Sequence, residues 1–153
     1  MIGHSNDHLY LNDLTVGDFY VSGKFHLDAD QIKTFAGQFD PQPFHMPEKA
    51  AQDSVFSGLI ASGWQTAAIT MKLLGESIPL DNAIISAGQE IKWPNPARPG
   101  DDLQVVSEVV SITASESKSD RGLVTIRTET FNQCGQQLQH LIAKFVVFRR
   151  KRE

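Results

Sequence analysis

The chain has 153 residues, of which 41% are hydrophobic and 21% are charged, and its formal net charge is −4. This length is sufficient to bury a core without staples, and the apolar content excludes a disordered chain. We therefore expect one domain over residues 1–153, and the acidic balance argues against nucleic acid as a partner because duplex binding needs a dense basic face.

Cysteine usage and apolar runs indicate the cellular setting. Cys134 is the single cysteine, so it has no intramolecular disulfide partner, and no Cys/His cluster has the spacing of a structural metal site. We expect neither a metal nor another cofactor. Residues 1–7 lack the cationic region and apolar run of a leader, and no segment approaches the ~20 apolar residues of a membrane span. These patterns predict a cytoplasmic protein that does not enter membranes.

The first part of the chain predicts a strand, a short helix and a stiff loop. Residues 16–27 have strand character, and residues 31–36 are expected to form a helix whose N-cap is Asp28 or Asp30. Two prolines within residues 38–45 remove backbone donors and forbid a regular helix or a central strand there. A second short helix follows, with Pro47 in its first turn.

Residues 62–75 form the strongest structural signal, because they are apolar or small on nearly all sides. Ser62 is a suitable N-cap, and Gly75 is expected to end the helix in the left-handed conformation. Such a pattern is typical of a helix surrounded by protein. We predict a buried helix of about four turns, roughly 20 Å long.

From residue 84 onward the hydrophobic period changes to two, which is typical of antiparallel strands. The predicted strands are 84–93, 103–114, 122–131 and 137–148. A long buried helix followed by these strands predicts an α+β domain in which a curved sheet wraps one helix, the hotdog arrangement. The pattern also allows a sheet with the helix on one open face.

Asp40 and His45 are the side chains best placed for chemistry, because they lie five positions apart in the proline-fixed loop. Together they could hold one water, the carboxylate accepting its proton and the imidazole exchanging one near neutral pH. The alternative is structural: Asp40 as a turn or cap residue, and His45 as a loop residue bonded to backbone. A third metal ligand is nowhere indicated.

The predicted start of the long helix offers a second element of a site. Backbone N–H groups and the helix dipole at Ser62 and Gly63 could stabilise negative charge on a thioester oxygen, and a glycine lets the acyl group approach the backbone. The alternative for Gly63 is close packing of the helix against the sheet.

Three segments resemble one family. Residues 35–45 read FAGQFDPQPFH, residues 58–63 read GLIASG, and residues 93–101 read WPNPARPGD. An Asp-x-x-Pro-x-His loop joined to an Ile-x-x-Gly helix start is similar to the hydratase motif of MaoC-like dehydratases and R-specific enoyl-CoA hydratases. The third segment resembles the turn after the next strand of that family, so the likeness orders nearly the whole chain.

The resemblance implies a hotdog fold, a homodimer or dimer-based oligomer with a joined sheet, and an acyl-CoA thioester as substrate. By position, Asp40 and His45 match the family's catalytic pair, and Gly63 matches its oxyanion-hole glycine. One departure is Gln42, which holds the place of the usual Asn. It bears on substrate choice more than on the reaction, and we assign Gln42, Ser62, Trp64 and Arg98 to substrate binding.

The leading hypothesis is a hydro-lyase that reversibly hydrates a 2-enoyl-CoA to a (3R)-3-hydroxyacyl-CoA. One alternative is a hotdog acyl-CoA thioesterase, and another is a non-catalytic acyl-CoA binding module. The Asp-x-x-Pro-x-His spacing favours hydration. The basic tail of residues 149–152 is favoured as a solvated strand end that keeps an edge soluble, and the functional alternative is a site for phosphates such as those of CoA.

Overall fold

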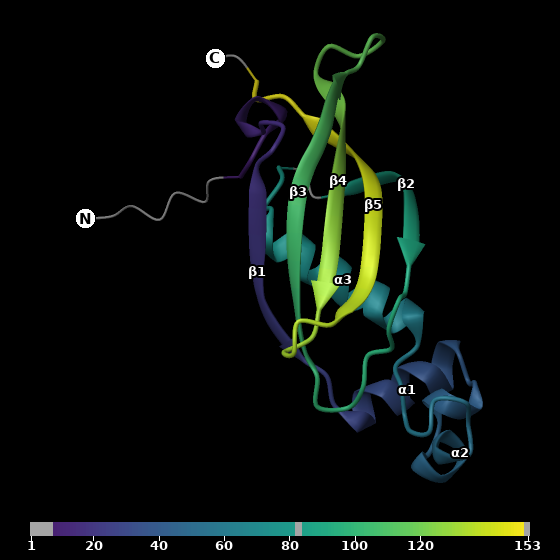
Figure 1. Ribbon diagram of the computed structural model, residues 1–153. Coiled ribbons are helices and arrows are strands. Elements are labelled where there is room, and N and C mark those ends of the chain that lie inside the picture. The colour runs from purple at the N-terminus through teal and green to yellow at the C-terminus, as the bar shows by residue number, and fades with distance from the viewer. Residues whose placement is uncertain (1–7, 82–83, 152–153) are drawn as a thin grey trace.

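The computed structural model describes residues 8–81 and 84–151 (Figure 1). The predictions made for residues 1–7 and for Arg152 of the basic tail lie outside these residues. In chain order the elements are β1 (Phe19–His26), α1 (Ala29–Phe39), α2 (Glu48–Gln52), α3 (Gly63–Ser77), β2 (Ile85–Lys92), β3 (Asp102–Ala114), β4 (Arg121–Phe131) and β5 (Gln137–Phe148), with 3₁₀ turns at Leu11–Asp13 and Pro43–His45.

In the described part of the chain, five strands form one antiparallel sheet in the order β1-β3-β4-β5-β2. Buried and more exposed residues alternate strictly along β4, as expected for a strand with one face on a core. Figure 1 shows the sheet curving across α3, while α1 and α2 lie beyond one end of it. This arrangement is the hotdog fold, and it confirms the predicted α+β class.

The core lies between α3 and the concave face of the sheet. Ile69, Leu73 and Leu74 of α3 are buried against strand residues such as Leu103 and Phe145. A polar contact crosses the same interface, where the hydroxyls of Thr70 and Thr130 lie 2.6 Å apart. Apolar burial of this kind contributes about 25 cal/mol per Å², so α3 is held mainly by its packing.

The predicted start of α3 is correct, but its predicted end is not. Ser62 is the N-cap, but the prediction that Gly75 ends the helix is wrong. Gly75 keeps a helical conformation, and the helix continues to Ser77, where the Ile78 N–H donates to the Leu74 carbonyl at 2.9 Å. The Ser77 hydroxyl also bonds a carbonyl of the last turn, so no left-handed residue is needed there.

Two earlier elements differ in length from their predictions. The first strand is shorter, because the chain turns at Gly17 with φ +95° before β1 begins. The first helix is longer and starts after Asp28, whose carboxylate accepts from the Gln31 N–H at 2.8 Å while the Gln31 side chain accepts from the Asp28 N–H. This reciprocal capping box fixes where α1 begins. The helix ends at Phe39, so Asp40 is the first residue after it.

None of the helices within residues 8–81 and 84–151 has both the length and the apolar character needed to cross a membrane.

Candidate active site

Asp40 and His45 lie on a loop that is fixed by its own backbone. Asp40 is the C-cap of α1, and its carbonyl accepts from the Gln42 N–H at 2.8 Å. The Gln42 carbonyl in turn accepts from the His45 N–H at 3.0 Å, within the 3₁₀ turn that Pro43 begins. Because proline holds φ near −65°, this short turn has little freedom. The loop therefore presents both side chains in one defined geometry.

The imidazole of His45 has a defined tautomer. Its Nδ1 lies 2.7 Å from the Ile60 carbonyl oxygen, and since a carbonyl only accepts, Nδ1 must carry the hydrogen. The other nitrogen, Nε2, lies 3.3 Å from Oδ2 of Asp40. The His45 side chain is 5% exposed and that of Asp40 is 22% exposed. The pair is thus largely screened from solvent, with Nε2 directed at the carboxylate.

Ser62 connects this pair to the start of α3. Its hydroxyl donates to Oδ2 of Asp40 at 2.7 Å and accepts from the Trp64 N–H at 3.2 Å. Ser62 is fully buried. A single hydroxyl therefore caps the helix and fixes the carboxylate.

The segment just before α3 ties the site together. The Ile60 N–H donates to the Phe44 carbonyl at 2.9 Å, beside the bond from His45 to Ile60. The next residue, Ala61, donates its N–H to the Ala97 carbonyl at 2.8 Å. The loop of Asp40 and His45, the start of α3 and the loop after β2 are consequently held in one hydrogen-bonded unit.

Gly63 is the first residue of α3, and its N–H is the donor left over at this helix end. Trp64 donates to the Ser62 hydroxyl, and Gln65 and Thr66 donate to the Ser62 carbonyl, whereas the Gly63 N–H has no partner among the described residues. An unbonded N–H at a helix N-terminus favours an electronegative oxygen. Gly63 also packs closely, because an added Cβ would lie 2.7 Å from the Trp93 indole.

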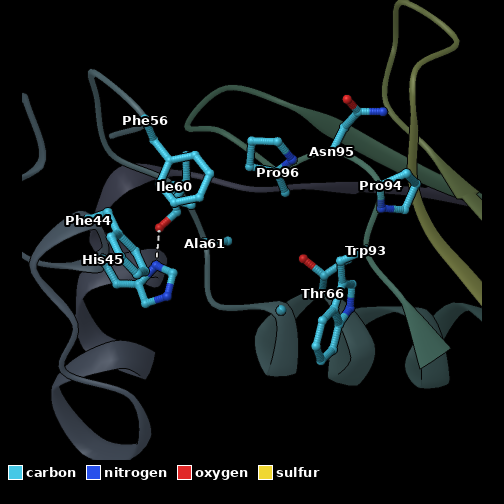
Figure 2. Close-up of a pocket in the computed structure, with 12 residues that line it drawn as sticks. Phe44, His45, Phe56, Ile60, Ala61, Thr66, Trp93, Pro94, Asn95 and Pro96 are labelled. Carbon is cyan, nitrogen blue, oxygen red and sulfur yellow. Dashed lines mark hydrogen bonds between the residues drawn. The ribbon is translucent and has the colours of Figure 1, made fainter. Parts of the chain in front are cut away.

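A pocket of about 260 Å³ opens beside these groups (Figure 2). His45 and Gly63 line it, whereas Asp40 is not among the lining residues and lies next to the His45 imidazole. Its walls are mainly apolar and aromatic, as is usual for small-molecule sites. The lining residues are Phe44, His45, Phe56, Ile60, Ala61, Gly63, Thr66, Trp93, Pro94, Asn95, Pro96 and Ala97.

The other residues assigned to substrate binding lie around the pocket, outside its lining. Gln42 is exposed on the loop, and Trp64 is 61% exposed and packs edge-on against Trp93. Arg98 is exposed at the rim, where its Nη2 donates to the carbonyl of Phe56, a lining residue, at 3.1 Å. Ser62 binds Asp40 and does not line the pocket.

Figure 1 shows the C-terminal end of β5, where the basic tail begins, at the other end of the sheet from α1 and α2. β5 starts near Trp93, whose Nε1 donates to Gln139, and its 12 residues end at Phe148, just before the tail. At about 3.3 Å per residue, Arg149 lies roughly 30 Å from Gln139. Arg150 instead pairs with Asp13 at 2.8 Å. Within this chain, Arg98 thus lies closer to the pocket than the basic tail does.

Several pocket residues were missed from the sequence. Phe44 and Phe56 form an aromatic pair, with ring centroids 5.1 Å apart, and the Phe44 ring also packs edge-on against the His45 ring. Their aromatic character beside the motif was the signal available for them. The Ile60 carbonyl, which sets the His45 tautomer, carries no sequence signal, because every residue has a carbonyl.

Comparison with known proteins places the chain in a family. The model of the MaoC like domain matches residues 15–131. The uncharacterized protein YdeM of Bacillus subtilis is 35% identical over 126 residues, which cover 80% of this chain and 87% of that protein. The (R)-specific enoyl-CoA hydratase of Rhodospirillum rubrum is 31% identical over 120 residues, which cover 78% of each.

A solved structure agrees with this likeness. The crystal structure of the MaoC-like dehydratase from Rhodospirillum rubrum has a TM-score of 0.91 and 54% identity, and the match covers 94% of this chain and 99% of that one. With the family model spanning most of the sequence and the relatives exceeding 30% identity, the chain belongs to the family of MaoC-like domains.

Proposed function

We propose that the protein is a hydro-lyase that reversibly adds water to the double bond of a 2-enoyl-CoA, giving a (3R)-3-hydroxyacyl-CoA. The observation that carries the proposal is the His45 imidazole, whose Nδ1 is bonded to the Ile60 carbonyl so that Nε2 faces Asp40 at 3.3 Å. In neutral His45, Nε2 and the Asp40 carboxylate are both acceptors. One water with two O–H groups can satisfy both at once.

The chemistry follows from that water. Its oxygen bonds to C3 while the pair takes one of its protons, and the pair returns a proton to C2, so that it ends with the protons it began with. Electrons from the double bond move onto the thioester oxygen in the transition state. The Gly63 N–H is the backbone donor available to that oxygen, and the helix dipole adds to the stabilisation.

Two comparisons support this reaction class. The chain belongs to the MaoC-like family, and a relative with 31% identity is named an (R)-specific enoyl-CoA hydratase.

The neighbouring residues have supporting roles. The Ser62 hydroxyl donates a hydrogen bond to the Asp40 carboxylate and so holds it in place. We assign Trp64 and Gln42, both exposed beside the site, to contacts with the pantetheine arm or its surroundings.

The direct test of the reaction is to mix the protein with crotonyl-CoA and follow the absorbance of the conjugated double bond, together with release of free CoA thiol. Hydration removes the absorbance and releases no thiol. Thiol release would instead indicate attack on C1, as in a thioesterase. Binding of crotonyl-CoA without either change would indicate a binding module.

We further propose that Arg98 contacts the CoA phosphates. Its guanidinium lies at the pocket rim and bears the charge that a phosphate prefers. Replacing Arg98 with Ala should raise KM for crotonyl-CoA up to about fivefold, the range of an exposed ion pair, and leave kcat nearly unchanged. Kinetics at low and high salt should give a smaller difference at high salt.

The matched control is Arg150→Ala, which removes an arginine at the far end of the sheet. It should leave KM unchanged. An increase in KM for Arg150→Ala, with none for Arg98→Ala, would return the phosphate site to the basic tail.

We also propose a cytoplasmic homodimer, or a larger assembly built from dimers, without nucleic acid or membrane as a partner.

A further inference from the structure

Trp93, the residue just after β2, is held from three directions. Its indole Nε1 donates to the Gln139 side chain at 2.9 Å. The Trp64 ring packs edge-on against it, with centroids 5.2 Å apart and an interplanar angle of 82°. The third contact is the Gly63 backbone, where a Cβ would meet three indole atoms at 2.7–2.9 Å. The indole therefore has one well-defined position.

That position lies across the pocket from the catalytic pair. Figure 2 shows Trp93 on the opposite side of the pocket from His45, with Ala61 between them. The indole packs on the backbone of Gly63, whose N–H is the proposed partner of the thioester oxygen. A thioester in the pocket is consequently enclosed by His45 on one side and by Trp93 on the other.

The direction in which water adds to an enoyl thioester explains why both sides of the pocket matter. A 2-enoyl thioester is planar through its conjugated carbons, and water adds to C3 perpendicular to that plane. The pair that holds the water must then lie over one face of the double bond. Whatever stands across the pocket covers the other face and limits how far the substrate can move away from the water.

We propose that Trp93 is a substrate-positioning residue that holds the enoyl thioester against the water bound by Asp40 and His45. This inference rests on the proposed hydratase function and names how the site fixes its substrate. Trp93 contributes no proton. Its effect is on the distance between water and C3, and a displacement of 1 Å can cost on the order of 10²-fold in rate.

Gln139 is the positioning residue behind Trp93. It is fully buried on β5, and its carbonyl oxygen accepts the indole N–H. Its Nε2 is buried without a hydrogen-bond partner among the described residues. The Trp93 indole N–H is thus the one hydrogen-bond partner that the Gln139 side chain has among the described residues.

The test compares variants in steady-state hydration of crotonyl-CoA. Trp93→Leu should lower kcat by about 10- to 100-fold, with a much smaller change in KM, because the substrate still binds but sits farther from the water. Trp93→Phe should recover most of kcat, since it keeps an aromatic wall. Gln139→Leu removes the hydrogen bond that fixes the indole, so the ring can move and kcat should fall by about fivefold.

The matched control is Phe19→Leu, an exposed aromatic on β1 that does not line the pocket. It should leave both constants unchanged. Thermal unfolding of each variant separates loss of fold from loss of positioning, and Trp93 is already 40% exposed, so its truncation should be tolerated. If Trp93→Leu failed to fold, the Gln139→Leu kinetics would decide the matter.

The results of these experiments separate the positioning role of Trp93 from the proposed hydratase function. Hydration by the wild type, with kcat unchanged in Trp93→Leu or a loss that Trp93→Phe does not recover, would overturn the positioning role alone. A wild type that hydrates no enoyl-CoA would overturn the proposed function and the positioning role with it.

Discussion

At the scale of single residues, the site depends on two atoms whose roles the motif does not reveal. The Ile60 carbonyl decides which nitrogen of His45 carries the hydrogen, and the Ser62 hydroxyl holds Oδ2 of Asp40. Both structural alternatives considered from the sequence are partly true as well. Asp40 caps α1, and His45 is bonded to backbone. These structural bonds leave Nε2 and the carboxylate close together, so structure and chemistry use different atoms of the same residues.

The prediction at this scale concerns the pair itself. Asp40→Asn and His45→Gln should each lower kcat by about 10² to 10⁴, because each removes one acid/base partner. The fold should persist, since the prolines and similar side-chain volumes remain. Circular dichroism and thermal unfolding check the fold, and the crotonyl-CoA assay checks the rate. A variant that hydrates at near wild-type rate would show that its residue is not in the pair.

Asp40, His45 and Gly63 could be predicted from the sequence because their spacing and the family resemblance carry the information. The structure brings all three to one site, which leaves their catalytic roles as predictions for the assays. The role of Trp93 could not be predicted. It depends on a hydrogen bond to Gln139, 46 positions away, and on contact with Gly63, which local patterns do not encode.

At the scale of elements, Gly63, the first residue of α3, has two structural features that bear on the site. Its N–H has no partner within residues 8–81 and 84–151, and its absent Cβ makes room for the Trp93 ring. The packing role considered for this glycine is therefore present, and it is compatible with the proposed catalytic role.

Gly63→Ala tests that element. The added Cβ would lie 2.7 Å from the indole, so we expect overpacking of about 1–3 kcal/mol in urea unfolding and loss of most hydration activity. The control is Gly37→Ala in α1, where a Cβ meets nothing within 4 Å. That change should stabilise by about 0.5–1 kcal/mol, as helix interiors favour alanine over glycine. Equal effects of the two variants would contradict the packing argument.

Elements with strong periodicity were predictable, and their ends were less so. The alternation of β4 and β5 places both strands within a residue of the predicted ranges. Gly75 misled the prediction of where α3 ends, because a glycine near a helix end is typical of a left-handed cap but is also tolerated inside a buried helix. Packing of the last turn, with Leu74 fully buried, continues the helix past it.

At the scale of the whole molecule, the sheet has two outer strands, β1 and β2. Nearly every residue of β2 is exposed, and Ile85 is 44% exposed. An exposed edge offers unpaired backbone groups to another strand, and a two-fold contact between copies would satisfy them. We therefore expect light scattering at micromolar concentration to give a dimer.

Edge variants locate the contact. Ile85→Lys on β2 should shift the protein toward monomer, whereas Val21→Lys on β1, also exposed, should leave the dimer intact. An active wild-type monomer, or dissociation by Val21→Lys alone, would contradict the proposed interface.

We propose that one face of an enoyl thioester receives water from Asp40 and His45. The most direct measurement is to hydrate crotonyl-CoA with the protein and offer the product to two dehydrogenases, one specific for (3R)- and one for (3S)-3-hydroxyacyl-CoA. We predict oxidation by the (3R)-specific enzyme alone, because His45 lies on one side of the pocket and the relative with 31% identity is named an (R)-specific hydratase. Oxidation by the (3S)-specific enzyme alone, or no hydration of any enoyl-CoA, would contradict the account.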